Sequence, residues 1–462
     1  MGTDSQTAPN TPSESASQTA DVRAPSFKAA LWFWLKLGFI SFGGPSGQIA
    51  IMHTELVERR RWISEQRFLH ALNYCMLLPG PEAQQLATYL GWLMHKTRGG
   101  ILAGLLFVLP SLLILIALSW IYLAWGHTSL VAGVFAGIKP AVVAVVIHAM
   151  VRLGTRTLNN TTLWSVAIGA FIAMVVLGLP FPLIILIAAA LGYVGARVRP
   201  AAWTQSAVHK TTGRDRQTAL IHEHSPRAEH TRFSWSRLAR VVGAGALLWL
   251  VPFVALALSG GLQHGLAQMA WFFTKTALLT FGGAYAVLPY VYQGAVVEYG
   301  WLSAAQMMDG LALGETTPGP LIMVVAFVGF VGGYAQSLLG PHLPLLSGVV
   351  AACVVTWFTF LPSFIFILAG GPLVESTQGE VRLMAPLQAI TAAVVGVIAQ
   401  LAWLFAFHTF WPAGISQGVD IPAAVLAGLA LLALIKFKRG VIEVILACAS
   451  AGLALKAMSL LM

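Results

Sequence analysis

Long apolar runs separated by short polar or basic stretches dominate this chain, and they predict membrane-spanning helices. Ile101 to Trp125 contains no charged residue, nor does Thr161 to Ala196 across its Gly178 to Pro182 punctuation. Each of these runs could cross a hydrocarbon core of about 30 Å. The pattern predicts thirteen apolar segments: 28–50, 68–95, 101–125, 130–152, 162–178, 182–198, 238–260, 267–297, 304–337, 345–370, 386–410, 421–436 and 441–461.

A pattern of helix breakers occurs twice, and the two copies are 239 residues apart at every landmark. Gly-Gly and Pro-Gly-Pro interrupt helices, and broken helices at membrane depth are tolerated only where they are buried in protein or line a polar cavity. A duplicated transport site is therefore the first hypothesis. The pairs are Lys36 with Lys275, Phe42-Gly43-Gly44 with Phe281-Gly282-Gly283, Trp62-Ile63-Ser64 with Trp301-Leu302-Ser303, and Pro79-Gly80-Pro81 with Pro318-Gly319-Pro320.

The repeat continues further along the chain with a spacing of 252 residues. Leu109-Pro110-Ser111 matches Leu361-Pro362-Ser363, and Val142-Val143 matches Val394-Val395. Six segments, one segment and six segments then follow one another, so the second half enters the membrane from the opposite side. The sequence predicts an all-α polytopic membrane protein built from two inverted-topology repeats with broken or re-entrant helices.

These features divide the chain into five parts. The first is polar and rich in Ser, Thr, Ala and Pro, which favours a disordered tail over a signal peptide. The predicted parts are the tail 1–27, a first repeat 28–198, a basic linker 199–237, a connecting transmembrane helix 238–260 and a second, inverted repeat 261–462.

The placement of Arg59-Arg60-Arg61 leaves two topologies open. If 28–50 and 68–95 each cross once, the three arginines lie outside the cell. If each segment is a hairpin turning at Gly43-Gly44 or Pro79-Gly80, they lie inside. Basic residues favour the cytoplasmic side, so we favour hairpins; either version leaves the inversion intact.

Composition and charge agree with a membrane protein. The chain is 57% hydrophobic and only 10% charged, too few charges to cover a soluble globule of this size. The net charge of +10 does not indicate nucleic acid, because +6 of it falls between Arg197 and Arg240. A basic cytoplasmic loop facing anionic lipid explains it. The N-terminus is then inside the cell and the C-terminus outside.

The broken helices suggest an anion site. A half-helix begins with free backbone N–H groups and a partial positive charge, and glycine lets a ligand approach the main chain. One such motif alone would be read as a kink or a close helix crossing, but four in register favour a binding site. The candidate substrate-binding residues are Lys36, Phe42, Gly43, Gly44, Pro79, Gly80, Pro81, Lys275, Phe281, Gly282, Gly283, Tyr285, Thr317, Pro318, Gly319 and Pro320.

Scarce charges within the apolar sequence are candidates for coupling or gating. Lys36 and Lys275 occupy equivalent positions and could supply charge, although either could instead reach the membrane interface. Glu82, Lys139 and Glu315 have no charged counterpart in the other half. Either carboxylate could balance a lysine or carry a coupling proton, and a structural ion pair is the alternative. Lys139 is a third cation within the apolar sequence, and any role for it is not symmetric. No motif predicts a cofactor or a metal site, and the three cysteines are isolated.

The sequence resembles the chromate ion transporters of the CHR superfamily, in their long, two-domain form. The resemblance implies export of chromate, with sulfate as a mimic, from the bacterial cytoplasm across the inner membrane, and hence chromate resistance. In that membrane the C-terminus would be periplasmic. It implies no cofactor and no enzyme activity, and a homodimer stays open. It rests on Phe42-Gly43-Gly44-Pro45, Arg61-Trp62-Ile63-Ser64, Leu78-Pro79-Gly80-Pro81, Gly137-Ile138-Lys139-Pro140, Thr280-Phe281-Gly282-Gly283-Ala284-Tyr285 and Thr316-Thr317-Pro318-Gly319-Pro320, within about residues 28 to 460.

Three other readings remain open. The first is a transporter for another anion such as sulfate, and the second is a channel. The third is a membrane enzyme acting on lipid phosphate, against which no nucleophile–base pair or metal constellation recurs near the breaks. Chromate reduction is weaker still, because the three cysteines are scattered and no flavin or haem motif appears. No ATP-binding GxxxxGK[ST] motif is present, so a secondary transporter is favoured over a pump driven by ATP.

Overall fold

The computed structural model describes residues 25–126, 128–198, 203, 220–221, 229–376 and 384–461. Over these residues the fold is helical, and the only β-type pairing is an isolated bridge between Ile63 and Ile221. In the part of the chain that the structure describes, seven helices are long and apolar enough to cross a membrane, and three more apolar helices are shorter. The multi-pass architecture is therefore confirmed, whereas nearly all of the expected disordered tail and most of the linker fall outside the described residues.

The first repeat contains seven helices, and its longest helix is bent. Non-helical dihedral angles at His95 and Lys96 divide that helix into a short first part and a long second part. The helices are α1 (Phe27–Ile40), α2 (Gly44–His53), α3 (Glu65–Leu77), α4 (Glu82–Trp125), α5 (Ser129–Thr157), α6 (Thr161–Val175) and α7 (Phe181–Val198).

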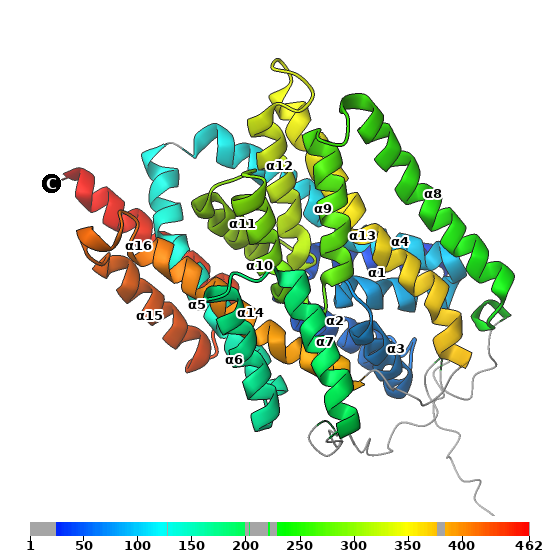
Figure 1. The fold of residues 1–462 in the computed structure, drawn as a ribbon. Helices are drawn as coiled ribbons and strands as arrows, with labels where there is room; N and C mark the ends of the chain where they lie inside the picture. Colours follow the sequence, from blue (N-terminus) through cyan, green and yellow to red (C-terminus); the bar gives the residue numbers. More distant parts are fainter. Residues whose placement is uncertain are drawn as a thin grey trace, which may run out of the picture.

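The connecting helix α8 (Trp235–Gly260) lies at the periphery, where it packs on α13 and α9 (Figure 1). The second repeat then follows the order of the first, except that a loop replaces the bend of α4. Its helices are α9 (Gly265–Leu279), α10 (Ala284–Tyr292), α11 (Ala304–Thr316), α12 (Val324–Gln336), α13 (Pro344–Ser376), α14 (Met384–Phe410), α15 (Ile421–Ile435) and α16 (Val441–Leu461).

Local sequence explains why the repeated motifs end and restart helices at the same places. Ser64 and Ser303 are the N-caps of α3 and α11, and each side chain accepts a hydrogen bond from the backbone three residues later. The short π-helical segments Thr54–Arg59 and Gln293–Glu298 extend α2 and α10. They are also 239 residues apart, so the repeat extends to local backbone geometry.

In each repeat the first two helices, α1 with α2 and α9 with α10, form a helical hairpin. The rings of Phe33 on α1 and Trp62 after α2 lie 5.7 Å apart, and the equivalent Phe272 and Trp301 lie 5.5 Å apart. The chain after each first break therefore returns beside the helix from which it left.

The next pair of helices returns to the same base. Nε2 of His95, at the bend of α4, lies 3.1 Å from the carbonyl oxygen of Pro25, just before α1. In the second repeat, Nε2 of His264, just before α9, lies 3.0 Å from the carbonyl oxygen of Leu338, just after α12. Each repeat thus begins with two hairpins that share one base.

Described linker residues lie at the base of the first repeat. The backbone N–H of Ser64 donates to the carbonyl oxygen of Ile221 at 2.9 Å. His230 Nε2 lies 3.1 Å from the carbonyl oxygen of Trp92, close to the bend of α4. The start of α1, the end of the first hairpin and the linker are thus on one face of the molecule.

The two repeats exchange their later helices. α5 packs on α15 and α16 of the second repeat, and α14 packs on α6 and α7 of the first (Figure 1). Glycine permits this proximity: a Cβ at Gly137 on α5 would lie 2.0 Å from the carbonyl oxygen of Cys448 on α16. A Cβ at Gly396 on α14 would lie equally close to the carbonyl oxygen of Ala167 on α6. The repeats are interlocked rather than side by side.

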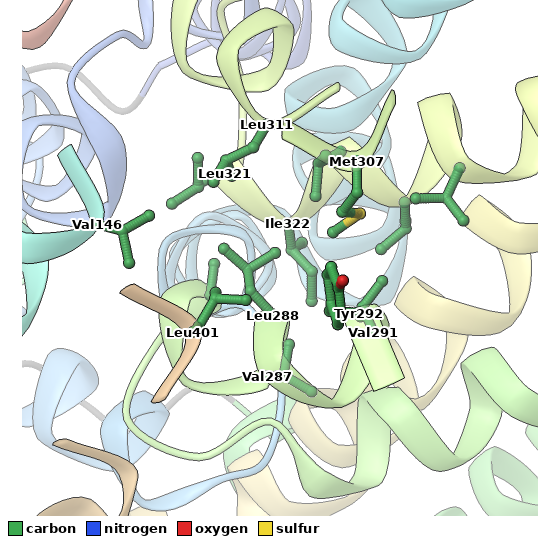
Figure 2. Close-up of a cluster of buried hydrophobic side chains, with 14 of the residues drawn as sticks. Val146, Val287, Leu288, Val291, Tyr292, Met307, Leu311, Leu321, Ile322 and Leu401 are labelled. Carbon is green, nitrogen blue, oxygen red and sulfur yellow. The ribbon is translucent and has the colours of Figure 1, made fainter. Parts of the chain in front are cut away.

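The largest apolar cluster surrounds the second copy of the broken helix. Val287, Leu288 and Val291 of α10 belong to one buried cluster with apolar side chains from α5, α11 and α14 (Figure 2). Its counterpart α2 buries only Gln48 and Met52 and packs mainly on α4. Equivalent half-helices therefore occupy different environments, one enclosed and one half-exposed.

Candidate functional site

The four helix breaks meet through two reciprocal backbone hydrogen bonds. The N–H of Gly80 donates to the carbonyl oxygen of Thr280 at 2.7 Å, and the N–H of Gly319 donates to the carbonyl oxygen of Ser41 at 2.8 Å. Gly80 corresponds to Gly319 and Ser41 to Thr280. Each Pro-Gly-Pro turn thus binds the residue that precedes Phe-Gly-Gly in the other half.

Close packing at the two turn glycines follows the same symmetry. A Cβ at Gly80 (φ +127°) would lie 2.3 Å from Oγ of Ser363, and one at Gly319 (φ +103°) would lie 2.6 Å from Cβ of Ser111. Ser111 and Ser363 are the serines of the matched Leu-Pro-Ser motifs. The flanking prolines Pro81, Pro318 and Pro320 are buried and Pro79 is half-buried.

One polar side chain at the breaks has no counterpart. Gln48 is buried and donates through Nε2 to the carbonyl oxygen of Gly319 at 2.5 Å, while its Oε1 has no partner. The equivalent position in the second half is Val287. Thr317 is buried at the end of α11 and donates its hydroxyl to the carbonyl oxygen of Gly314 at 3.2 Å, so it satisfies helix backbone.

The glycines of Phe-Gly-Gly begin the half-helices as expected. Gly43 (φ +84°) and Gly283 (φ +97°) are the N-caps of α2 and α10, and neither has a side chain to satisfy the free N–H groups of the first turn. A Cβ at Gly43 or Gly283 would meet no non-local atom within 3.9 Å. Both helix starts are therefore open toward any group placed beside them.

Arg152 on α5 is such a group. Its guanidinium donates to Oγ of Ser46 on α2 and acts electrostatically on Tyr285 on α10. Ser46 and Tyr285 are 239 residues apart, in the first turns of the two half-helices. None of the ion pairs of the described chain includes Arg152. Within the described residues Arg152 thus has no carboxylate partner; it lies beside the start of α2 and acts electrostatically on the first turn of α10.

Sequence reasoning singled out Tyr285 but not Arg152. Arg152 is an exposed arginine near the end of a helix, the usual sign of a membrane interface, and only its contact with Ser46 distinguishes it from Arg156. Tyr285 donates its hydroxyl to Glu315, which is 6% exposed. The structure thus connects Arg152 to Ser46, two residues after Gly44, and by its electrostatic effect to Tyr285, which binds Glu315 and follows Gly282 and Gly283.

The two equivalent lysines are not among the residues that meet at the breaks. Lys36 is exposed and lines an outer hollow of about 550 Å³ with Trp32, Phe39 and Arg60. Lys275 is half-exposed, with Nζ 6.0 Å from the ring centre of Phe272. Phe42 is exposed and Phe281 half-buried at the breaks themselves.

The remaining candidates separate into two regions. Glu82 lies in the first turn of α4, directly after Pro81, and is half-buried. Lys139 lies on α5, where it acts electrostatically on Asp309 of α11. Asp309 is 4% exposed and accepts a hydrogen bond of 2.9 Å from the hydroxyl of Tyr122. Sequence reasoning missed Asp309, although it is a lone charge in apolar sequence just as Lys139 is.

Comparison with known proteins gives a consistent result. The profile of the family described as chromate transporter matches residues 28–193 and 267–453. A chromate transport protein of Pseudomonas aeruginosa is 33% identical over 452 residues, which cover 96% of each chain.

Two further relatives carry similar names. A chromate transport protein of Cupriavidus metallidurans is 28% identical over 90% of each chain. A probable chromate transport protein of Synechococcus elongatus is 29% identical over 81% of this chain and 84% of its own. No solved structure matches this chain.

Proposed function

This chain belongs to the chromate transporter family, and we propose that it exports chromate or a similar tetrahedral oxyanion such as sulfate from the cytoplasm. Such export would confer chromate resistance. Chromate and sulfate are dianions that need positive charge and hydrogen-bond donors once their water is removed. The family membership supports this class of substrate, and the geometry around the breaks supports a binding site there.

The hydrogen bond of Arg152 to α2, together with its electrostatic effect on Tyr285 of α10, is the observation that carries this proposal. Ser46 and Tyr285 belong to the first turns of α2 and α10, whose free N–H groups carry partial positive charge. Adding a guanidinium there concentrates charge of one sign, which is unfavourable unless an anion balances it. A tetrahedral oxyanion between the helix starts satisfies all three groups at once.

Within this site the residues have different tasks. Arg152 supplies charge, and Gly43, Gly44, Gly282 and Gly283 present main-chain donors. Phe42 and Phe281 border the site, Thr317 with the two Pro-Gly-Pro turns holds the half-helices in place, and Lys36 and Lys275 attract the anion from outside. Tyr285 and Glu315 limit the depth to which the anion enters, because a carboxylate repels it.

The reciprocal hydrogen bonds support two inverted repeats. When residue i of one unit binds j of the other and j binds i, the units are related by a two-fold rotation. A single connecting helix, α8, then places the repeats in opposite orientation across the inner membrane. Nine crossings and four re-entrant hairpins follow, with the N-terminus and the basic linker cytoplasmic and the C-terminus periplasmic.

The unequal packing of α2 and α10 supports alternating access. In an inverted pair, two different environments of equivalent elements represent the two states that each element adopts in turn. α10 is enclosed and α2 is half-exposed beside Arg152, so the anion enters from the α2 side in this state. Export needs no ATP, because moving negative charge out of the cell gains about 2.3 kcal/mol per charge per 100 mV.

Transport by inside-out membrane vesicles tests the proposal. Vesicles containing the protein should accumulate radiolabelled chromate faster than vesicles lacking it, with saturation, and sulfate should compete. Uptake that never saturates would instead support a channel. Competition by molybdate or carboxylates but not sulfate would point to a different anion. Equal chromate uptake with and without the protein would reject the function altogether.

A further inference from the structure

Asp309 is a buried carboxyl group that the anion site does not use. One oxygen accepts the hydroxyl of Tyr122, and the other, Oδ1, has no hydrogen-bond partner. The ring of Tyr122 packs on Phe135 and Phe327, with ring centres 5.0 Å and 5.4 Å away. An ionised carboxylate in such apolar surroundings is expensive and marks a functional site by default.

The cation that faces Asp309 is Lys139, and no ion pair within the described chain joins them. α11 packs against α4, α5, α12, α14 and α16. The other charges of α5 begin at His148, more than two turns along the helix, and those of α4 end at Arg98. Tyr334 on α12, His408 on α14, and Glu443 and Lys456 on α16 are not among the groups that act on Asp309.

A permanent ion pair occupies the corresponding place in the other half. Arg67 on α3 and Glu375 near the end of α13 form a 2.6 Å salt bridge, to which Tyr89 donates its hydroxyl. Under the repeat spacings, Asp309 corresponds to His70, one turn from Arg67, and Tyr122 corresponds to Val374, next to Glu375. The ion pair joins α3 of the first repeat to the end of α13 of the second. The Asp309–Tyr122 hydrogen bond joins α11 of the second repeat to the end of α4 of the first.

These two interactions between the repeats differ in how they respond to protons. The Arg67–Glu375 pair stays charged because the guanidinium does not lose its proton in proteins. The carboxylate of Asp309 accepts one hydrogen bond, from Tyr122, and the ammonium of Lys139 acts on it without forming an ion pair. A proton can therefore neutralise Asp309. Protonation removes the attraction between Asp309 and Lys139, and with it one of the links that hold α11 to α5.

We propose that Asp309, with Tyr122 and Lys139, is a proton-binding site whose occupancy couples oxyanion transport to proton movement. This inference rests on the proposed oxyanion transport. Proton binding releases α11 on one face of the protein while the Arg67–Glu375 pair holds the other face closed. The positive charge of Lys139 would repel a metal cation, so a proton fits this site better than a metal ion does.

Purified protein in vesicles that contain the pH indicator pyranine provides the test. An imposed chromate gradient should change the internal pH with the wild type. Asp309→Asn should abolish this pH change and retain exchange of radiolabelled chromate for sulfate at equal pH on both sides. Retained exchange shows that the variant is folded. Asp420→Asn, at an exposed helix cap, should behave as the wild type in both assays.

A second variant separates proton binding from a structural role. Tyr122→Phe keeps the carboxyl group but removes the hydrogen bond that favours its charged form, so proton-coupled uptake should reach half its maximum at higher pH. An unchanged pH profile, or a pH change with Asp309→Asn equal to that of the wild type, overturns the inference. So does wild-type chromate transport without proton movement. A wild type that exchanges neither anion overturns the proposed function as well.

Discussion

The backbone N–H of Gly80 donates to the carbonyl oxygen of Thr280 at 2.7 Å, which joins the Pro-Gly-Pro turn of one repeat to the Phe-Gly-Gly break of the other. Gly319 and Ser41 repeat this relationship at 2.8 Å. Neither turn tolerates a side chain, because φ is positive and a serine of the opposite long helix touches the glycine. The junction of the repeats thus depends on four short segments.

Replacing either turn glycine should destabilise this junction. Gly80→Ala and Gly319→Ala should each lower the free energy of unfolding by about 2–4 kcal/mol, from backbone strain and from overpacking. Transport should fall with it. The thermal unfolding midpoint of the detergent-purified protein measures the effect.

Matched variants distinguish strain from contact at these glycines. Gly340 has φ +114° but open space around its Cα, so Gly340→Ala should show the strain alone. Ser363→Ala removes the oxygen that an added Cβ at Gly80 would meet and should partly rescue Gly80→Ala. At Gly319 the nearest atom is Cβ of Ser111, so only Ser111→Gly should give relief there. Equal rescue by alanine at both serines would contradict this geometry.

Arg152 should matter more than its neighbour on the same helix. Arg152→Gln removes a charge-assisted hydrogen bond worth about 1.5–3 kcal/mol, so KM for chromate should rise by about 10- to 150-fold. Arg156→Gln should leave KM within about twofold. Kinetics of chromate uptake by vesicles measure both variants.

Lys36 and Lys275 provide a comparison with Arg152. Because Lys36 is exposed and Lys275 half-exposed, away from the breaks, Lys36→Ala and Lys275→Ala should alter KM less than Arg152→Gln does and should show a stronger dependence on salt. If substituting the lysines changes KM more than Arg152→Gln does, the lysines rather than Arg152 supply the positive charge that binds the anion.

The Arg67–Glu375 pair should show strong coupling between its members. Its side chains are 16% and 2% exposed, so Glu375→Gln leaves a buried guanidinium unpaired and should lower stability by about 3–5 kcal/mol. The double variant Arg67→Met with Glu375→Leu should recover most of that loss. A double-mutant cycle of unfolding midpoints gives the coupling; additive effects would mean that the pair contributes little.

Alternating access predicts that α2 packs on α5, in one state of the cycle, as α10 packs on α14 in this structure. Leu288 on α10 and Leu401 on α14 belong to the same apolar cluster, and their counterparts are Ile49 on α2 and Ala149 on α5 (Figure 2). Ile49→Cys with Ala149→Cys, in a chain without Cys75, Cys353 and Cys448, should therefore cross-link more readily as the protein cycles. Chromate should change the cross-linking rate, and the cross-linked protein should not transport. Absence of any cross-link during turnover would oppose this form of alternation.

The helical architecture and the position of every break could be predicted from the sequence, because apolar runs and Gly or Pro punctuation act locally. The two repeat spacings also predicted which residues are equivalent. They could not show that Gly80 contacts Thr280. A constant spacing along the sequence is the same whether the two repeats are related in space by a translation or by a rotation. Nor could they show that α5 packs on α16. A small residue such as Gly137 permits a close helix crossing, but it does not determine which helix crosses there.

The candidate site was only partly predictable for a similar reason. Glycines at the breaks were identified because their conformational role depends on their own residue type. Arg152 was missed, because its meaning depends on Ser46 and Tyr285, which lie far from it in sequence. Asp309 could have been found, since it satisfies the same criterion as Lys139, a lone charge within apolar sequence.

The exchange of helices between the repeats has a consequence for how the protein is made. α5 enters the bilayer early, but Gly137 cannot receive its partner on α16 until nearly the whole chain has left the ribosome. At about 5–20 residues per second, that delay is roughly 15–60 s. During it, the surface of α5 around Gly137 lacks its α16 partner, so a chain that stops before α16 leaves this surface uncovered.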